Sequence, residues 1–414
     1  MSKRPVTPGD LLFLRRGNIS EKKQKPTLLW ISSNNWSWAV AKGNASTYKD
    51  QFEGGFFGRV ICVHPLARET QTITIGPNHD VVEFGFDSLP GGARWRWLRI
   101  MYAPLYILIS ALGIRKLIRK HRVDIVRASD PYWAAAIGYL ACFGKAVKYC
   151  ISIHADWDLM HKLDPNHSPE LLKSRKLAKF LEWYLLRSAH RVLCIRQHLS
   201  KYAEKSGARA DGIRLIRHGI DMSQFDSSSE LSIDLPNKKR IVFAGRLSKE
   251  NYIDDVIALG EALISRSDTC LLIAGSGLEE IRVKTKVQAK EELRNRIIFL
   301  GNLSREQVIA LRFSADINLV PMGGFSLIEA CATGKATVAY DVEWHDELIT
   351  DGESGLLIPE NDIDALTAGV ERLLDQPEFA KELGAQGRKA TRELHDFKNV
   401  FPQRAAVYQE LMEE

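Results

Sequence analysis

Short apolar runs alternate with helix-like stretches in two successive series along this chain of 414 residues. The first series has its expected strands at 27–33, 58–64, 123–128, 146–153 and 191–195, with 72–75 and 81–86 as edge pieces, and the run 213–221 ends this half. The second series has strands at 240–244, 270–274, 296–300, 317–320 and 337–340, and helices at 361–374 and 377–394. Strands that alternate with helices favour parallel sheets covered on both faces. The pattern predicts an α/β fold with two doubly wound, Rossmann-like halves.

The length of the chain supports the same division, because it exceeds what one typical core holds. We place the N-terminal domain at 1–226 and the C-terminal domain at 240–397. The segment 227–239 is polar and contains Pro236, so it is the expected linker. Hydrophobic residues make up 45% and charged residues 26%, as in soluble globular proteins.

The cysteines and the N-terminus indicate the compartment. Six cysteines, none in a Cys-x-x-Cys pair, mostly fall in apolar strand-like runs, which favours reduced thiols in a cytoplasmic protein. The opening residues Met-Ser-Lys-Arg-Pro lead into no apolar stretch, so no signal peptide is expected. No apolar run reaches the length of a bilayer span. The net charge of +6 is mild, and we expect no nucleic-acid partner.

The segment 94–122 has two interpretations. It is apolar in its middle and basic at both flanks, and Trp95 and Trp97 stand near one end. An interfacial membrane anchor has this make-up. A helix packed on the sheet of the first domain, with Arg and Lys on its solvent face, would have it too.

The stretch 316–340 reads as strand, glycine turn, helix and strand. Gly323 and Gly324 allow a sharp turn and a close approach to a ligand, and Ser326 is the expected N-cap of the helix. Free N–H groups and the helix dipole at such a turn suit a phosphate, and Glu329 could reach ribose hydroxyls beside it. An ordinary strand–helix–strand turn with a surface glutamate fits the same residues.

The segment from Gly323 to Pro359 resembles the donor-binding core of retaining GT-B glycosyltransferases of group 1 (glycosyltransferase family 4 type). The likeness rests on Gly-Phe-Ser-Leu-Ile-Glu-Ala, Thr-Gly-Lys-Ala-Thr-Val-Ala-Tyr-Asp and Asp-Gly-Glu-Ser-Gly-Leu-Leu-Ile-Pro. It implies two Rossmann-like domains that face each other across a cleft, and a last helix, 398–414, that crosses back to the first domain. It also implies a nucleotide-diphosphate sugar as substrate, with no further cofactor and no metal.

The resemblance gives roles to residues around the donor. Arg246, in Phe-Ala-Gly-Arg-Leu-Ser-Lys, matches an arginine that grips the pyrophosphate. The matching lysine position holds Asn251, so Lys249, two residues earlier, is a candidate substitute. Glu329 matches the second of two paired glutamates, while Pro321 stands at the first. The implied donor-binding residues are Arg246, Lys249, Gly275, Gly301, Asn302, Gly323, Gly324, Phe325, Ser326 and Glu329.

His154 follows the expected strand 146–153, and a histidine at the carboxyl end of a parallel strand points into the ligand crevice. By resemblance it contacts the donor sugar near the reacting carbon, so the expected catalytic residues are His154, Glu329 and Arg246. A hydrogen-bonded structural histidine is the alternative. His154, Asp156, Asp158 and His161 follow no standard metal-ligand spacing, and we expect no metal there.

The expected function is transfer of a sugar, with retention, to a hydroxyl of a glycan or a lipid-linked glycan. The expected location is the cytoplasm, or the inner face of the membrane if 94–122 anchors the protein. A non-catalytic nucleotide-sugar-binding subunit is the alternative, because the first glutamate is missing and the lysine is shifted. A GT-B sugar-nucleotide epimerase or hydrolase fits the motifs less well.

Overall fold

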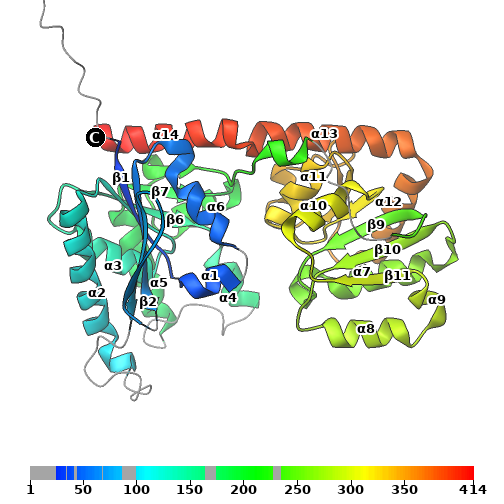
Figure 1. Ribbon diagram of the computed structural model, residues 1–414, viewed down its shortest axis with the longest axis horizontal. Helices are drawn as coiled ribbons and strands as arrows, with labels where there is room; N and C mark the ends of the chain where they lie inside the picture. Colours follow the sequence, from blue (N-terminus) through cyan, green and yellow to red (C-terminus); the bar gives the residue numbers. More distant parts are fainter. Residues whose placement is uncertain are drawn as a thin grey trace, which may run out of the picture.

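The structure is a computed structural model that describes residues 25–33, 35–41, 44–67, 69–85, 99–163, 174–226 and 235–414. Its strands form two sheets, one in each half of the chain, and Figure 1 shows the halves as two lobes side by side. Most of the predicted linker and both tryptophans of the 94–122 segment lie outside the described residues.

The N-terminal lobe has an eight-stranded sheet in the order β3-β4-β2-β1-β5-β6-β7-β8. Neighbouring strands are parallel except β3 and β4, which are antiparallel. The strands are β1 (Thr27–Ile31), β2 (Arg59–Ala67), β3 (Gln71–Gly76), β4 (His79–Gly85), β5 (Ile125–Ala128), β6 (Lys148–Ile153), β7 (Arg191–Cys194) and β8 (Ile213–Leu215). One prediction was inexact, because strand β4 lies inside the sheet and only β3 is an edge piece. The run 213–221, which ends the first half, contains the three-residue strand β8.

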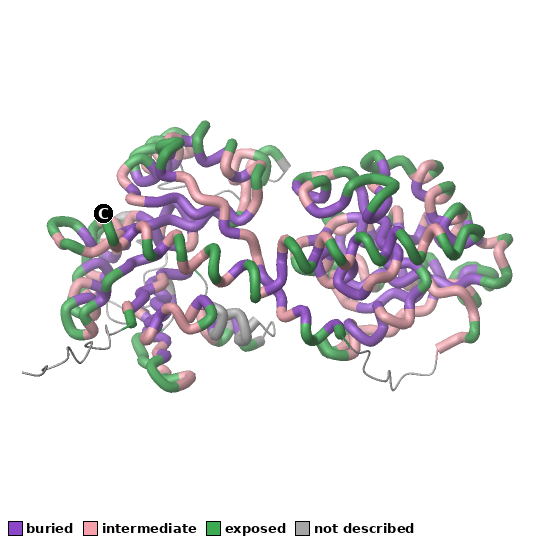
Figure 2. The backbone as a smooth tube through the Cα atoms, turned by 90° about the horizontal axis from the view of Figure 1, so that it is seen from above, coloured by how far each residue is buried: buried purple, intermediate pink, exposed green. Residues whose placement is uncertain are grey.

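Helices cover both faces of this sheet. They are α1 (Trp36–Ala41), α2 (Arg99–His121), α3 (Trp133–Cys142), α4 (Trp157–Leu163), α5 (Arg175–Ser188) and α6 (Gln197–Lys205), with 3-10 helices η2 (Asn44–Gly55) and η7 (Ala210–Gly212). The 3-10 helix η8 (Met222–Phe225) packs instead in a core of the C-terminal lobe. Each face has its own core, built from alternate residues of the same strands. Seen from above in Figure 2, buried strands run through the middle of each lobe.

Helix α2 settles part of the question about 94–122. One side of it packs into the lobe, where Tyr106, Ile114 and Ile118 are buried. The opposite side leaves Leu105 and Leu112 exposed. The helix therefore packs on the sheet, as one interpretation required, and also keeps an apolar outer stripe. Within the described residues, no helix has the length and hydropathy needed to cross a membrane.

The C-terminal lobe has a six-stranded parallel sheet in the order β11-β10-β9-β12-β13-β14. The strands are β9 (Lys239–Ala244), β10 (Thr269–Ala274), β11 (Ile297–Gly301), β12 (Ile317–Leu319), β13 (Ala336–Tyr340) and β14 (Leu356–Ile358). The helices of this lobe are α7 (Ile253–Ala262), α8 (Glu280–Gln288), α9 (Glu291–Arg294), α10 (Arg305–Phe313), α11 (Phe325–Ala332), α12 (Ile363–Asp375) and α13 (Pro377–His395), and its 3-10 helices are η9 (Lys249–Asn251), η10 (Leu263–Ser265) and η11 (His345–Glu347). A last helix, α14 (Phe397–Glu413), follows α13. Strand β14 was not predicted. The six cysteines are free and buried.

Helix α14 returns to the N-terminal lobe and runs along its edge in Figure 1. A buried network fastens it there. Glu53 accepts from Arg127 of β5 at 3.0 Å and from Arg404 of α14 at 3.1 Å, and its side chain is fully buried. Arg127 also donates to the hydroxyl of Tyr408. The carboxylate thus joins the first lobe to the last helix of the chain.

Candidate functional site

The C-terminal sheet changes direction between β9 and β12. From β9 the chain goes outward through β10 to β11, and then from β12 through β13 to β14 on the other side. Ligands of doubly wound sheets bind at the carboxyl ends of such a strand pair, because the loops that follow diverge there. The loop after β9 carries Arg246, and the loop after β12 carries the glycine turn. Both predicted donor-binding segments therefore flank one switch point.

The glycine turn is held by aromatic side chains behind it. Gly323 donates its N–H to Nε2 of His345 at 3.2 Å, and its carbonyl accepts from Nε1 of Trp344 at 3.0 Å. A β-carbon on Gly323 would lie 2.7 Å from Val320, so only glycine fits. Helix α11 begins at Phe325, and the N–H groups of its first turn have no partner within the helix. The bonds to His345 and Trp344 therefore hold the turn in place, and the N–H groups of the first turn of α11 remain as hydrogen-bond donors for a ligand.

The prediction that Ser326 caps helix α11 is wrong. The N-cap residue is Gly324, and no side chain caps the helix. The Ser326 hydroxyl instead donates to the carbonyl of Ala244 at 3.2 Å and accepts from Nη2 of Arg312 at 2.8 Å. Arg312 also donates to Ala244 at 3.1 Å. Since Ala244 ends β9, these bonds tie the two switch-point loops together.

Glu329 already has a cationic partner. Its carboxylate accepts from Nε of Arg305 at 2.9 Å, and Arg305 also donates to Gln224 at 2.9 Å. The Glu329 side chain is only 13% exposed. A carboxylate can accept several hydrogen bonds, so ribose hydroxyls could be added beside the guanidinium.

The two predicted cations lie on the loop after β9. Arg246 and Lys249 are both exposed. Asn251, at the position where the resemblance expects lysine, donates its amide to the carbonyl of Arg246 at 3.0 Å. Asn251 therefore shapes the loop rather than presenting a charge to a ligand.

The other predicted glycines are at loop contacts. Gly275 donates its N–H to the carbonyl of Gly301 at 2.7 Å. Its φ is 128°, and a β-carbon there would lie 2.0 Å from the carbonyl oxygen of Gly245. Gly275 thus lets the loops after β9 and β10 pack closely. Asn302 is exposed at the end of β11.

His154 directly follows β6 and belongs to a row of rings that joins the lobes. Its ring stacks on His218 with centroids 5.9 Å apart, and His218 lies 4.6 Å from the ring of Phe325, the first residue of α11. His154 is open to solvent on one side. Neighbouring protein atoms displace water from the imidazole, and three nearby arginines repel its charged form. Both effects lower the pKa of His154 to about 4. The imidazole is therefore neutral at pH 7.

Arg196 was missed by the sequence reasoning. Its guanidinium lies over the ring of Trp344 at 4.3 Å, pairs with Glu343 at 3.3 Å, and would be 3.5 Å from a β-carbon on Gly324. It thus brings a cation from the N-terminal lobe to the glycine turn. Its position in the sequence could have indicated it. Arg196 lies just beyond the carboxyl end of β7, as His154 lies just beyond the carboxyl end of β6.

The acidic residues near His154 bond to other groups of the N-terminal lobe. Asp156 accepts from the N–H groups of Asp158 and Leu159 at 2.9 Å each, at the start of α4. Asp158 pairs with Arg175 and Lys179. These contacts give both carboxylates structural roles.

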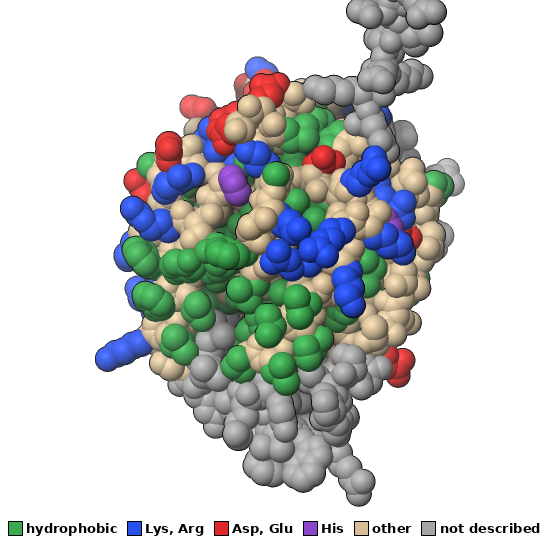
Figure 3. Space-filling model, turned by 90° about the vertical axis from the view of Figure 1, so that its left-hand side faces the viewer, with side chains coloured by type: hydrophobic (Ala, Val, Ile, Leu, Met, Phe, Trp, Pro, Cys, Tyr) green, Lys and Arg blue, Asp and Glu red, His purple; other side chains and the backbone are tan. Residues whose placement is uncertain are grey.

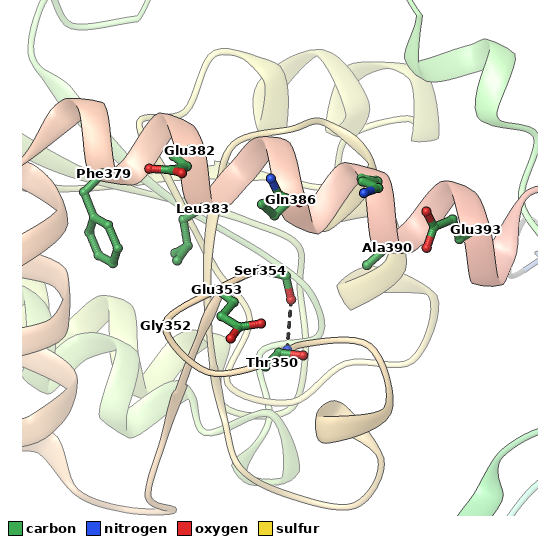
Figure 4. Close-up of a pocket in the computed structure, with 11 residues that line it drawn as sticks. Thr350, Gly352, Glu353, Ser354, Phe379, Glu382, Leu383, Gln386, Ala390 and Glu393 are labelled. Atoms are coloured by element: carbon green, nitrogen blue, oxygen red, sulfur yellow. Dashed lines mark hydrogen bonds between the residues drawn. The ribbon is translucent and has the colours of Figure 1, made fainter.

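A separate hollow of about 480 Å³ lies between helix α13 and the loop 350–354. Figure 4 shows Glu382 and Gln386 on the helix above Glu353 and Ser354 of the loop. Ser354 accepts from the N–H of Thr350 at 2.9 Å. None of the predicted site residues lines this hollow.

Comparisons with known proteins match both lobes. Residues 230–390 match the family model described as "Glycosyl transferases group 1", and residues 76–224 match "Glycosyltransferase Family 4". An uncharacterized glycosyltransferase of Methanocaldococcus jannaschii is 25% identical over 240 residues, which cover 55% of this chain and 60% of that protein. The chain spans less than two thirds of the length of several curated relatives that it matches.

Solved structures with the same architecture cover nearly the whole chain. Sucrose-phosphate synthase from Thermosynechococcus elongatus superposes with a TM-score of 0.72 at 19% identity, over 94% of this chain and 99% of that one. Anabaena HepE in complex with UDP gives a TM-score of 0.66 at 16% identity, over 93% and 100%. The fold is therefore GT-B, as predicted, and the matches support a glycosyltransferase of group 1.

Proposed function

We propose that this GT-B protein transfers a sugar, with retention, from a nucleotide-diphosphate sugar to a hydroxyl of a glycan or a lipid-linked glycan. The observation that carries the proposal is the bonding of Ser326 and Arg312 to Ala244. It joins the Arg246 loop to the glycine turn at the switch point, where doubly wound sheets bind their ligands. The likeness to HepE, which was solved with UDP, agrees with such a donor.

In this proposal the protein stabilises the departing nucleoside diphosphate. The dipole and free N–H groups of α11 face the diphosphate, and Arg246 and Lys249 add positive charge. A retaining reaction without a protein nucleophile has the acceptor attack on the face that the diphosphate leaves. The leaving phosphate takes the proton of the acceptor hydroxyl, so no protein base and no metal are assigned.

The competing function is binding without catalysis. Asn251 bonds to its own loop, and Pro321, where the resemblance expects a glutamate, is buried. Labelled donor sugars, incubated without acceptor, separate the two functions, because a transferase releases some sugar to water. If the protein binds the nucleoside diphosphate but releases no sugar from any donor, the enzymatic function is contradicted.

Arg246→Ala is expected to weaken nucleoside diphosphate binding by about 1.5–3 kcal/mol, the strength of a hydrogen bond to a charged group. Lys249→Ala is expected to weaken it less, because a guanidinium makes two parallel bonds to a phosphate and an ammonium does not. The measurement is the shift in melting temperature with UDP, GDP and ADP.

Arg282→Ala is the matched control, since Arg282 is an exposed arginine of the same lobe that pairs with Asp254 and Glu279. Equal losses for Arg246 and Lys249 would make Lys249 a full substitute for the lysine. If both Arg246→Ala and Lys249→Ala keep the wild-type shift in melting temperature, neither residue binds the pyrophosphate.

Glu329→Gln is expected to weaken nucleotide binding by about 1–3 kcal/mol, because the amide accepts hydrogen bonds from ribose less strongly than the carboxylate. Wild type should prefer a nucleoside diphosphate over its 2′,3′-dideoxy form, and the variant should lose much of that preference. If the preference is unchanged, Glu329 serves only to hold Arg305.

A further inference from the structure

One face of the N-terminal lobe leaves large hydrophobic side chains in solvent. The exposed residues come from three helices: Leu105, Leu108 and Leu112 of α2, Leu140 of α3 with Phe143 just after that helix, and Phe180, Trp183 and Tyr184 of α5. Figure 3 looks at this side of the molecule and shows hydrophobic side chains gathered there, with a group of Lys and Arg side chains beside them. Phe143 is 65% exposed and Phe180 is 59% exposed. A monomer rarely exposes such a cluster without a partner.

The three helices form one continuous surface. Arg115 of α2 donates to the carbonyl of Leu140 at 3.4 Å. Tyr139 of α3 contacts Phe143 and shares a 2.7 Å hydrogen bond with the hydroxyl of Tyr184. On α5, Phe180 stacks on Trp183 with centroids 6.1 Å apart. We call this set of exposed residues on α2, α3 and α5 the three-helix surface.

The charge of the three-helix surface has one sign. Helices α2, α3 and α5 contain a single acidic residue, Glu182, and its side chain is fully buried. Basic residues follow the apolar stripe of α2 on its outer side, where Lys116 and Arg119 are exposed. Arg187 of α5 lies 6.0 Å from the ring of Trp183. The surface is thus apolar with a basic border and no exposed carboxylate.

This combination fits an anionic bilayer better than a second copy of the chain. Leucine side chains can enter the acyl boundary, and Trp and Tyr favour the headgroup level. Lys and Arg are attracted by anionic headgroups. A symmetric contact between two copies would instead set one basic border against another, which repels.

A helix between parallel strands begins at the carboxyl edge of the sheet and ends at the amino edge. Leu105 and Leu108 lie in the first half of α2, nearer the carboxyl edge, whereas Leu140 and Phe143 lie at the end of α3, nearer the amino edge. The three-helix surface therefore extends along the side of the lobe from one edge of the sheet toward the other. We propose that the three-helix surface docks the protein on an anionic lipid bilayer. This docking does not depend on the proposed sugar transfer.

Co-sedimentation of the full chain with lipid vesicles tests the docking. Wild type is expected to bind vesicles of mixed phosphatidylglycerol and phosphatidylcholine at an ionic strength of about 0.01 M, and to bind at least tenfold more weakly at about 1 M, where screening is strong. Vesicles of phosphatidylcholine alone should bind it weakly. The double variant Leu108→Glu with Phe180→Glu should lose at least tenfold in binding, and Lys116→Glu with Arg119→Glu should lose a similar factor at low salt.

The control is Leu278→Glu with Ile281→Glu. These residues are 96% and 82% exposed on the C-terminal lobe, so the change is chemically the same at a different place. It should leave vesicle binding unchanged, and all variants should keep the melting temperature of wild type. No binding of wild type to anionic vesicles at low salt would overturn the proposal, and so would equal losses in the control pair. A wild-type dimer that Leu108→Glu with Phe180→Glu converts to a monomer would overturn it too, because the surface would then join two copies.

Discussion

Glu53→Ala is expected to lower the free energy of unfolding by about 3–5 kcal/mol, the loss found when one partner of a buried ion pair is removed. Glu53 is the carboxylate between Arg127 and Arg404, and all three side chains are buried or nearly so. Its removal leaves two guanidinium groups without a counter-charge in the core. Glu53 has a φ of 46°, and alanine keeps a β-carbon, so backbone strain is the same in both proteins. The measurement is denaturant unfolding of the full chain.

Glu410→Ala is the control for this prediction. Glu410 also attaches α14 to the N-terminal lobe, through Arg191 and Arg214, but it lies at the surface, where solvent screens the pairs. Its loss should cost far less stability. A Glu53 variant as stable as the Glu410 variant would mean that packing of Tyr408 and Leu411, and not the ion pairs, holds α14.

The strands could be predicted because both faces of each sheet are covered. Under those conditions a strand is an uninterrupted apolar run, as in Leu271–Ala274, and its place in the chain is visible without any partner. Strand β14 has only three residues, and the polar turn before it and Pro359 after it leave no longer apolar run to mark it. The order of strands in each sheet follows from doubly wound topology rather than from composition.

The candidate site could be predicted only as far as local sequence determines it. The glycine turn lies where the spacing of Gly323 and Gly324 indicated. Ser326 was misplaced, because its hydroxyl finds the carbonyl of Ala244, which is 82 residues away. The same limit hid Arg196, whose partners Glu343 and Trp344 belong to the other lobe.

The Glu53 network illustrates the limit most clearly. Glu53 and Arg404 are 351 residues apart, and neither stands out in its own segment. A charged residue in a polar stretch such as 44–55 is expected on the surface. Only the return of α14 to the first lobe buries the pair, and a single sequence carries no record of that contact.

His154→Ala is expected to lower the rate of sugar transfer on the order of 10²-fold, the usual cost of removing one preorganised donor from a transition state. Nucleoside diphosphate binding should be unchanged, since His154 reaches the turn of α11 only through His218 and Phe325. Transfer is measured with labelled donor, and binding by the thermal shift with the nucleoside diphosphate. Loss of both together would make His154 a structural residue.

The pH dependence of transfer gives an independent test of the same residue. A pKa of about 4, lowered from the ordinary 6.5, means that the folded protein keeps the His154 ring neutral through mildly acidic solution. Acidification should therefore remove the contribution of His154 only near pH 4, and the ratio of wild-type to His154→Ala rates should stay constant above that value. His154→Gln, a neutral donor of similar reach, should recover part of the rate. A wild-type-to-alanine ratio that changes near pH 6.5 would show that a protonated imidazole, and not the neutral ring, acts in transfer.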